Sequence, residues 1–370
     1  MDHQLKFVNS SHTRFFLELR KRVDAYFTSN GISPHANAAM VFKTIFMLAL
    51  YFVPYALLIS GTATGWGFWA CWALMGFGLA GIGMSVMHDA NHKAYSSSDT
   101  VNYIMGKTLN VVGGDARNWK AQHNILHHTY TNVYNADEDV NDKLGMRFSP
   151  AGKHRSIQRF QFLYAFVLYS IMTFYWVLLK DLIQHFRYQR KGLNKETGWK
   201  KVGTILSLVV WKLFYVGYML VLPALVLEVS FLKLFAGFLL LHLIAGTVLS
   251  VVFQLAHVVE AAEFPMPDAE GNLETEWAIH QLRTTADFAP GNPIITFYVG
   301  GLNYQAIHHL FPRICHIHYP KLAPIVAQTA KEFGVPYTVY PSFGKALRSH
   351  VRMLQKLGRK DYFHLIETMG

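Results

Sequence analysis

Three short stretches decide the fold of this chain: His88-Asp-Ala-Asn-His92, His123-Asn-Ile-Leu-His127-His128 and Gln305-Ala-Ile-His308-His309. We call them the first, second and third histidine box. Each box lies close to an apolar segment of the sequence. Polar, ionisable side chains at the edge of a membrane are costly, and their presence favours a functional role over accident. The rest of the chain is therefore interpreted as a means of bringing the three boxes together at one depth of a membrane.

The composition is that of an integral membrane protein. Of the 370 residues, 52% are hydrophobic and only 15% are charged, which is more apolar than an ordinary soluble domain. A helix needs about 20 mainly apolar residues to cross a bilayer. Four stretches qualify, at residues 39–60, 68–87, 202–227 and 232–253. We therefore expect an all-α membrane protein with four spanning helices in two hairpins.

The domain organisation that follows is simple. Residues 1–38 are largely polar and charged, so we expect a cytoplasmic arm there and no removable signal peptide. Residues 39–370 are expected to form a single membrane domain. Its metal-binding portions are expected at residues 88–201 and 254–370, between and after the two hairpins.

The distribution of charge predicts the orientation. The net charge is +11, and the basic residues fill the arm, residues 93–201 and the carboxyl-terminal region. The turns at 61–65 and 228–230 contain no basic residue, so the positive-inside rule places both turns away from the cytoplasm. Both termini and all three boxes are then cytoplasmic, in a bacterial inner membrane or the endoplasmic reticulum. A basic face beside anionic lipid explains the charge, docking of an acidic electron carrier is the alternative, and nucleic acid is not expected.

Residues 160–179 are apolar enough to span, but counting the crossings argues against it. If all three boxes supply ligands to one site, the chain must cross an even number of times between the second and third box. The two predicted spans in that interval already satisfy this condition. We therefore expect 160–179 to be interfacial or re-entrant, as its many aromatic residues suit the headgroup level. Residues 101–112 are too short to cross, and short helices are expected at 15–27 and 345–365.

The spacing within the boxes predicts metal binding. Residues four apart share one face of a helix, so His88 with His92, and His123 with His127, are each expected to hold one ion. Adjacent helical residues point about 100° apart. The pairs 127–128 and 308–309 are therefore suited to two separate ions, which favours a dinuclear site. His257, near the end of the fourth predicted span, is a further candidate ligand.

Other metal chemistries fit the sequence less well. Structural zinc takes about four ligands, fewer than the eight candidate histidines. The Glu-x-x-His pairs of soluble di-iron bundles are absent, and so is the His-Glu-x-x-His motif of zinc proteases. The two cysteines, Cys71 and Cys315, do not make a disulfide framework.

With these motifs in place, the chain resembles the membrane fatty acid desaturases. That family carries three boxes of this form and order, with two spans before the first box and two between the second and third. The resemblance implies a non-haem centre of two iron ions and O2 as co-substrate. The substrate would be a fatty acyl-CoA or acyl-lipid, with cytochrome b5 or a ferredoxin and its reductase as a separate electron donor. The implied iron ligands are His88, His92, His123, His127, His128, His257, Gln305, His308 and His309.

Three further polar residues are expected to orient ligand imidazoles through their second nitrogens, as metal-bound histidines generally require. They are Asp89, Asn91 and Asn303, for which helix capping or turn formation is the alternative.

Gln305 narrows the resemblance further. Glutamine in place of the first histidine of the third box is similar to the front-end branch, which inserts a double bond between an existing one and the carboxyl end. Two departures stand against this branch. A fused haem-binding cytochrome b5 domain is absent, and Ile307 occupies a position where glutamate is usual.

Two other functions remain open from the sequence. A fatty-acyl or lipid hydroxylase would share the hydrogen-abstraction step and the boxes. A histidine-rich membrane metal transporter would be expected to spread its histidines over both membrane faces and to carry several charges in mid-span, whereas only Lys212 lies deep in a predicted span.

Overall fold

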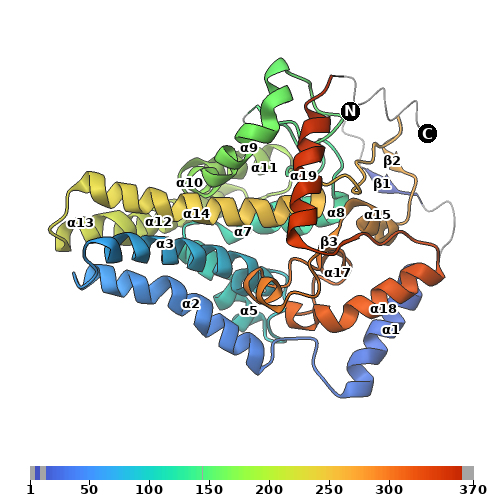
Figure 1. Cartoon of the computed structure of the whole chain (residues 1–370), viewed down its shortest axis with the longest axis horizontal. Coiled ribbons are helices and arrows are strands. Elements are labelled where there is room, and N and C mark those ends of the chain that lie inside the picture. Colours follow the sequence, from blue (N-terminus) through green and yellow to red (C-terminus); the bar gives the residue numbers. More distant parts are fainter. Residues whose placement is uncertain (1–4, 9–13, 144, 361–370) are drawn as a thin grey trace. The chain divides into compact units, whose positions relative to one another are not determined.

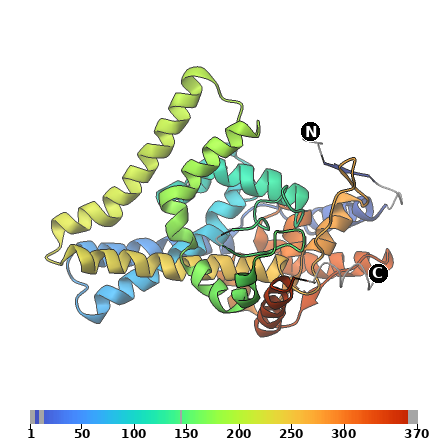
Figure 2. The same cartoon turned by 90° about the horizontal axis from the view of Figure 1, so that it is seen from above.

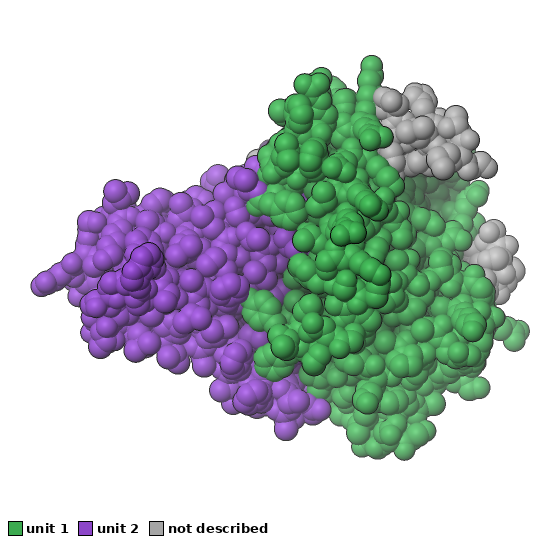
Figure 3. Space-filling model, in the orientation of Figure 1, with its two compact units in different colours: residues 1–35, 122–166, 252–370 green, residues 36–121, 167–251 purple. Residues whose placement is uncertain are grey.

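The structure is a computed structural model of the chain and describes residues 5–8, 14–143 and 145–360. Helices dominate, with four very short strands. The chain divides into two compact units, drawn in two colours in Figure 3. Unit 1 comprises residues 1–35, 122–166 and 252–370, and unit 2 comprises residues 36–121 and 167–251.

Four helices among the described residues are long and apolar enough to cross a membrane. They are Ala38–Ile59, Trp66–Asn91, Gly198–Val226 and Phe231–His257. A long apolar helix is thus found at each of the four predicted spans, and some of its ends extend beyond the apolar runs. The second span, for example, continues to Asn91 because backbone hydrogen bonding carries on through the polar first box.

Close packing of the first two apolar helices depends on glycine. Helix α2 (Ala38–Ile59) starts at Asn37, whose side chain accepts hydrogen bonds from the next backbone amides, and it packs along α3 (Trp66–Gly81) (Figure 1). A Cβ atom at Gly78 would lie 2.7 Å from the backbone nitrogen of Tyr51 on α2. Glycine is therefore what allows the two backbones to approach.

The second span ends in a π-helix, η1 (Ile82–Val86), followed by α4 (Met87–Asn91), which carries the first box. The next helices of unit 2 are each too short to cross a bilayer, as predicted for 101–112. They are α5 (Asp99–Gly106), α6 (Thr108–Val111) and α7 (Ala116–Lys120).

Residues 156–190 form a bent helical path. Its two parts, Ser156–Ser170 and Met172–Arg190, meet at 53°, a geometry that suits a broken span or a re-entrant loop. The interfacial or re-entrant placement of 160–179 therefore stays a prediction. The elements of this path are η3 (Ser156–Phe160), α9 (Gln161–Ser170), α10 (Met172–Tyr175), η4 (Trp176–Lys180) and α11 (Asp181–Arg190).

The third candidate span is built from α12 (Gly198–Val216), η5 (Gly217–Val221) and α13 (Leu222–Val226). It diverges from α14 (Phe231–His257), to which a short turn connects it (Figure 2). Only 17% of the most apolar stretch of this helix is buried. Most of this span is therefore available to lipid.

Unit 1 contains α1, whose apolar residues Phe15, Leu19, Val23 and Phe27 recur at four-residue intervals and are buried. This stripe packs on α18 (Tyr319–Glu332), and the helix, Phe15–Asn30, confirms the one predicted at 15–27. Helix α19 (Phe343–Leu357) confirms the predicted basic tail helix in part. It ends at Leu357, before residues 358–360, which are not helical, and residues 361–365 lie outside the described residues.

The remaining elements of unit 1 are short. Strand β1 (Lys6–Phe7) pairs in parallel with β2 (Asn272–Leu273), and β3 (Asp287–Phe288) pairs in parallel with β4 (Val339–Tyr340). The other helices are η2 (Ala121–His127), α8 (His128–Tyr130), α15 (Trp277–Thr284), α16 (Pro293–Tyr298), α17 (Gln305–Leu310) and η6 (His316–His318).

Candidate metal centre

The second box lies on a π-helix, η2, and this changes which histidines meet. A π-helix bonds residue i to residue i+5 instead of i+4. Accordingly, His123 Nε2 lies 3.2 Å from Nε2 of His128, five residues on. The structure therefore favours His128 over His127 as the partner of His123, because the wider turn brings His128 to the same face.

His128 also meets the third box. Its Nε2 lies 3.0 Å from Nε2 of His308, on α17. Imidazole nitrogens that bind one ion at about 2.0–2.1 Å lie ~3 Å apart, so this spacing matches a shared ligand set. We call His123, His128 and His308 group A.

A second set of histidines forms group B, which consists of His127, His257 and His309. Their candidate ligand atoms lie within 4.8 Å of one another, and all three side chains are buried. The Gln305 amide belongs to the same set, because its Nε2 lies 3.0 Å from His257 Nε2 and 3.3 Å from His309 Nε2. Rotating this amide by half a turn would present its oxygen, which is an acceptor, to the imidazole nitrogens.

Adjacent histidines divide between the two groups. His127 belongs to group B and His128 to group A, and His309 and His308 divide in the same way. This is the geometry expected for neighbouring helical residues that point about 100° apart. Unit 1 therefore contains two neighbouring sets of imidazole nitrogens.

Polar partners hold the second nitrogens of these rings. Asp137 Oδ2 lies 2.9 Å from His127 Nδ1, and both side chains are fully buried. Gln281 Oε1, on α15, accepts from His309 Nδ1 at 2.7 Å. The Tyr319 hydroxyl lies 3.2 Å from His308 Nδ1, and the Thr284 carbonyl lies 3.4 Å from His257 Nδ1. Such bonds fix the ring orientation and leave the other nitrogen to face a metal.

Asp137 has a marked effect on its partner. Burial lowers the pKa of His127, but the charge of Asp137 and its hydrogen bond outweigh burial, so that the pKa is raised above its ordinary value. The remaining nitrogen, His127 Nε2, is buried without a hydrogen-bond partner among the described residues. A buried nitrogen that has no hydrogen-bond partner and belongs to a cluster of imidazoles is consistent with a metal ligand.

Sequence reasoning missed Asp137 as an orienting residue. The acidic residues at 137–139, shortly after the second box, were a usable signal, because ligand imidazoles commonly donate to carboxylates. Asn132 was missed as well. Its buried side-chain amide donates to the carbonyls of His257 at 2.9 Å, Glu263 at 3.0 Å and Thr284 at 3.3 Å.

The first box belongs to unit 2. His88 and His92 lie side by side there, with ring centroids 4.8 Å apart, as the four-residue spacing predicted. The Trp119 ring packs edge-on against both, with centroids 5.5 Å from each. Asp89 Oδ1 lies 4.0 Å from His88 Nδ1, and Asn91 donates to the Gly106 carbonyl at 3.3 Å.

Asn303 has a different role from the one expected. Its amide donates to Thr296 Oγ1 at 3.0 Å and to the Ala289 carbonyl at 3.4 Å. These bonds stabilise the loop before α17. The contacts of Asn303 thus agree with the alternative prediction, a role in turn formation, and not with contact to a ligand imidazole.

The sequence of this chain is similar to those of known proteins. A match to the family described as "Fatty acid desaturase" covers residues 63–341. The chain belongs to the fatty acid desaturase family. It is 39% identical to the sn-1 linoleoyl-lipid 6-desaturase of Arthrospira platensis over 96% of this desaturase and 95% of that protein. The protein of the same name from Synechocystis sp. is also 39% identical, over 92% and 94% of the two chains.

A further relative, the acyl-lipid (8-3)-desaturase of Physcomitrium patens, is 36% identical over 97% of this desaturase and 74% of its own length. The family membership makes this chain an oxidoreductase and implies the use of iron. The residues present fit that metal, because groups A and B offer imidazole nitrogen donors, which suit iron. The His127 nitrogen without a partner supports the same fit.

Proposed function

We propose that this desaturase introduces a double bond into a lipid-bound fatty acyl chain, at a centre of two non-haem iron ions. Two hydrogens leave a methylene pair of the acyl chain. Together with two electrons from a donor and two protons, they reduce O2 to two molecules of water. Iron, when bound, supplies the activation of O2 that removal of hydrogen from an unactivated carbon requires.

One observation carries the proposal for two ions. The adjacent pairs at 127–128 and 308–309 divide their imidazoles between groups A and B, so that each group receives one histidine from each pair. A single ion would not need this division. We propose His123, His128 and His308 as ligands of one iron, and His127, His257, His309 and Gln305 as ligands of the other. The proposal also includes His88 and His92 as ligands, on the strength of the first-box motif.

The other residues of unit 1 hold these ligands in place. Asp137 and Gln281 accept hydrogen bonds from the Nδ1 atoms of His127 and His309, so the Nε2 atom of each ring is the one that we propose to bind metal. Burial excludes water, since Gln305 is only 3% exposed and His257 is fully buried. Exclusion of water protects a reactive site from side reactions.

We further propose front-end regiochemistry and an acyl-lipid substrate. The names of the relatives support this, since two are linoleoyl-lipid 6-desaturases and another is an acyl-lipid (8-3)-desaturase. Gln305 in the third box is the feature of this chain that agrees with them. We also propose that the electrons come from a separate donor of the cytochrome b5 or ferredoxin type.

The test is expression in a host that supplies linoleate and a reductase system, with lipid analysis by mass spectrometry. We expect a new double bond on the carboxyl side of the existing one, carried in membrane lipids. His127→Ala and His128→Ala are expected to abolish it, while His154→Ala, which changes a histidine outside the boxes, retains it. A hydroxylated product, or identical lipids from wild type and both box variants, would overturn the proposal.

Gln305 offers a sharper test of the second ion. Replacement by leucine removes the amide from group B, and we expect the iron content of purified protein to fall toward one ion per chain. Gln305→His returns a nitrogen donor and is expected to retain both ions. The matched control is Gln328→Leu, on exposed α18 surface. Iron content unchanged by Gln305→Leu would exclude the amide as a ligand.

A further inference from the structure

The connection between α11 and α12, within unit 2, carries a concentrated positive charge. Residues 187–201 contain a single acidic residue, Glu196. The basic residues of this segment are Arg187, Arg190, Lys191, Lys195, Lys200 and Lys201. A local excess of one charge raises the concentration of counter-ions at that surface. The ligand chemistry suggested by the segment is therefore anionic.

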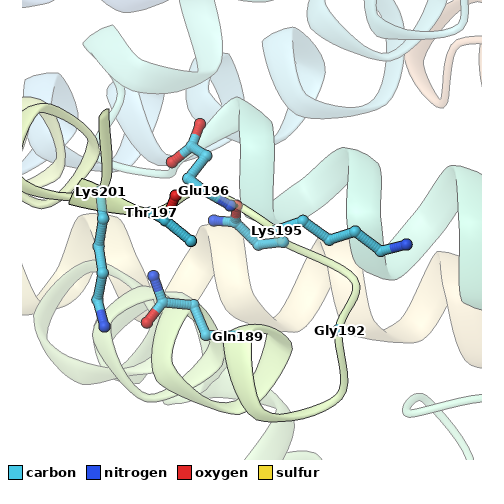
Figure 4. Close-up of a pocket in the computed structure, with 7 residues that line it drawn as sticks. Gln189, Gly192, Lys195, Glu196, Thr197 and Lys201 are labelled. Carbon is cyan, nitrogen blue, oxygen red and sulfur yellow. The ribbon is translucent and has the colours of Figure 1, made fainter. Parts of the chain in front are cut away.

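This segment borders a pocket of about 390 Å³. Figure 4 shows Gln189 and Lys201 with their polar ends on the same side of the pocket, whereas the Glu196 carboxylate points to the opposite side. Glu196 accepts a hydrogen bond from the Thr204 hydroxyl. Its negative charge is thus engaged away from the place where Lys201 and Gln189 meet.

Two buried side-chain nitrogens lie on one face of α11. Gln189 Nε2 and His185 Nε2 have no hydrogen-bond partner among the described residues. They are four residues apart and therefore share one face of the helix. The His185 side chain is only 2% exposed. Because buried polar groups in proteins are almost always hydrogen-bonded, an acceptor bound in the pocket would satisfy the Gln189 amide, which lines it.

The start of α12 adds to the positive potential. The Thr197 side chain makes no capping hydrogen bond, and Thr197 also lines the pocket. The first backbone N–H groups of the 19-residue helix α12 are thus available to an anion. An oxyanion in the pocket would meet Lys201, the Gln189 amide and the positive end of the helix.

The position of the pocket along the chain indicates its depth in the membrane. Helix α12 begins the candidate span Gly198–Val226, so its first turn must lie where the hydrocarbon gives way to headgroups. Trp199 is 87% exposed, and exposed tryptophan is typical of this interface. The anion available at that depth is the phosphate of a phospholipid.

We propose that the pocket between α11 and the start of α12 binds the phosphate of an anionic phospholipid headgroup. Lys201 forms the ion pair, and Gln189 donates a hydrogen bond. His185 lies four residues before Gln189 on α11 and does not line the pocket. The site contains no residue of the histidine boxes, and it is a binding site for a membrane lipid in its own right.

Thermal unfolding of the purified full chain in a neutral detergent tests the proposal. Short-chain phosphatidylglycerol is expected to raise the unfolding temperature, and short-chain phosphatidylcholine is not. Lys201→Gln is expected to require about tenfold more phosphatidylglycerol for the same shift, because it removes a charge-assisted hydrogen bond. Lys201→Arg is expected to behave like wild type. Equal unfolding temperatures without lipid show that the variants are folded.

Lys200→Gln is the matched control, since it removes the same charge at an exposed neighbour that does not line the pocket. We expect it to respond to phosphatidylglycerol as wild type does. An equal loss in both glutamine variants would indicate diffuse attraction and overturn the site. No difference between the two lipids would also overturn it. If inorganic phosphate gives the same Lys201-dependent shift, the ligand is free phosphate and the headgroup assignment is wrong.

Discussion

Asp137 holds the His127 ring from the side opposite to its free nitrogen. We expect Asp137→Asn to lower iron affinity by about 10- to 100-fold, the usual effect of losing a partner of a metal-bound histidine. The reason is that a neutral amide binds the Nδ1 proton less strongly than a carboxylate and no longer fixes the tautomer. Iron content after dialysis against a graded chelator measures the effect.

The matched control is Asp142→Asn, which makes the same change at an exposed carboxylate five positions along the same segment. It is expected to leave the iron content unchanged. If both variants lose iron equally, the effect of Asp137 arises from net charge and not from its contact with His127.

The buried side chain of His350 makes the free energy of unfolding depend on pH. It is fully buried on α19, where its Nδ1 donates to the Val258 carbonyl at 2.7 Å. Burial lowers its pKa to about 4, whereas an unfolded histidine has a pKa of about 6.5. The folded state thus disfavours the proton. The stability contributed by this neutral ring is complete above pH ~6.5 and is lost as the pH falls toward about 4.

We therefore expect His350→Gln to lose less stability on acidification than wild type does. The difference should be about 2 kcal/mol between about pH 7 and about pH 5. Thermal unfolding in detergent at the two pH values measures it, with His154→Gln, a partly buried histidine, as control. A wild-type loss on acidification that is unchanged in His350→Gln would show that other groups account for it.

At the scale of residues, the sequence predicted the ligand types better than their partners. The boxes made the histidines conspicuous, because clustered imidazoles have few structural uses. Gln281 and Tyr319 could not be assigned as orienting residues in the same way. Their contacts with His309 and His308 join positions whose relation depends on how α15, α17 and α18 pack, and no local pattern encodes that packing.

At the scale of elements, Asn132 joins three of them. It has a left-handed backbone, with φ +61°, and its amide bonds to carbonyls at the end of α14, in the following turn and at the end of α15. We expect Asn132→Ala to lower the free energy of unfolding by about 2–4 kcal/mol, since three carbonyls lose a donor, two of them in buried hydrogen bonds, and the backbone is strained. Denaturation monitored by tryptophan fluorescence measures the change.

Asn135→Ala separates the two causes. Asn135 has almost the same backbone conformation, with φ +67°, but its side chain is exposed. It therefore carries the strain of a left-handed alanine without the loss of buried bonds. We expect it to cost about 1 kcal/mol. Equal losses at the two positions would mean that the amide bonds of Asn132 contribute little.

The helix type of the second box also belongs to this scale. Spacing alone suggested an α-helix, and with it a partnership of His123 with His127. The structure has a π-helix there, which pairs His123 with His128. The sequence does not predict whether this segment forms an α-helix or a π-helix, because that depends on the packing of the whole segment and not on the propensities of its residues. The identity of the boxes was predictable, and their grouping was not.

At the scale of the whole molecule, the four apolar helices suit an integral membrane protein. These four helices could be predicted from the sequence because length and hydropathy are local properties. The bent path of residues 156–190 did not, since composition cannot distinguish a broken span from a re-entrant loop. How the chain is oriented is a prediction from charge alone.

Cysteine labelling tests that orientation. Both native cysteines are buried, so introduced thiols can be labelled over a low background. In intact cells, a charged maleimide is expected to label Thr64→Cys and Ser230→Cys, in the two uncharged turns, and to label Lys153→Cys only after permeabilisation. Labelling of Lys153→Cys alone in intact cells would reverse the predicted topology.

Unit 1 is assembled from three separate parts of the chain, residues 1–35, 122–166 and 252–370, and this affects how the protein is made. His128 and His308, which meet in group A, are 180 residues apart in sequence. A ribosome releases the chain from its amino terminus onward, so the second box waits in the membrane until the third has been synthesised. In the proposed centre, the ligands of group A are complete only once the third box has been made, so we expect iron insertion to follow its synthesis.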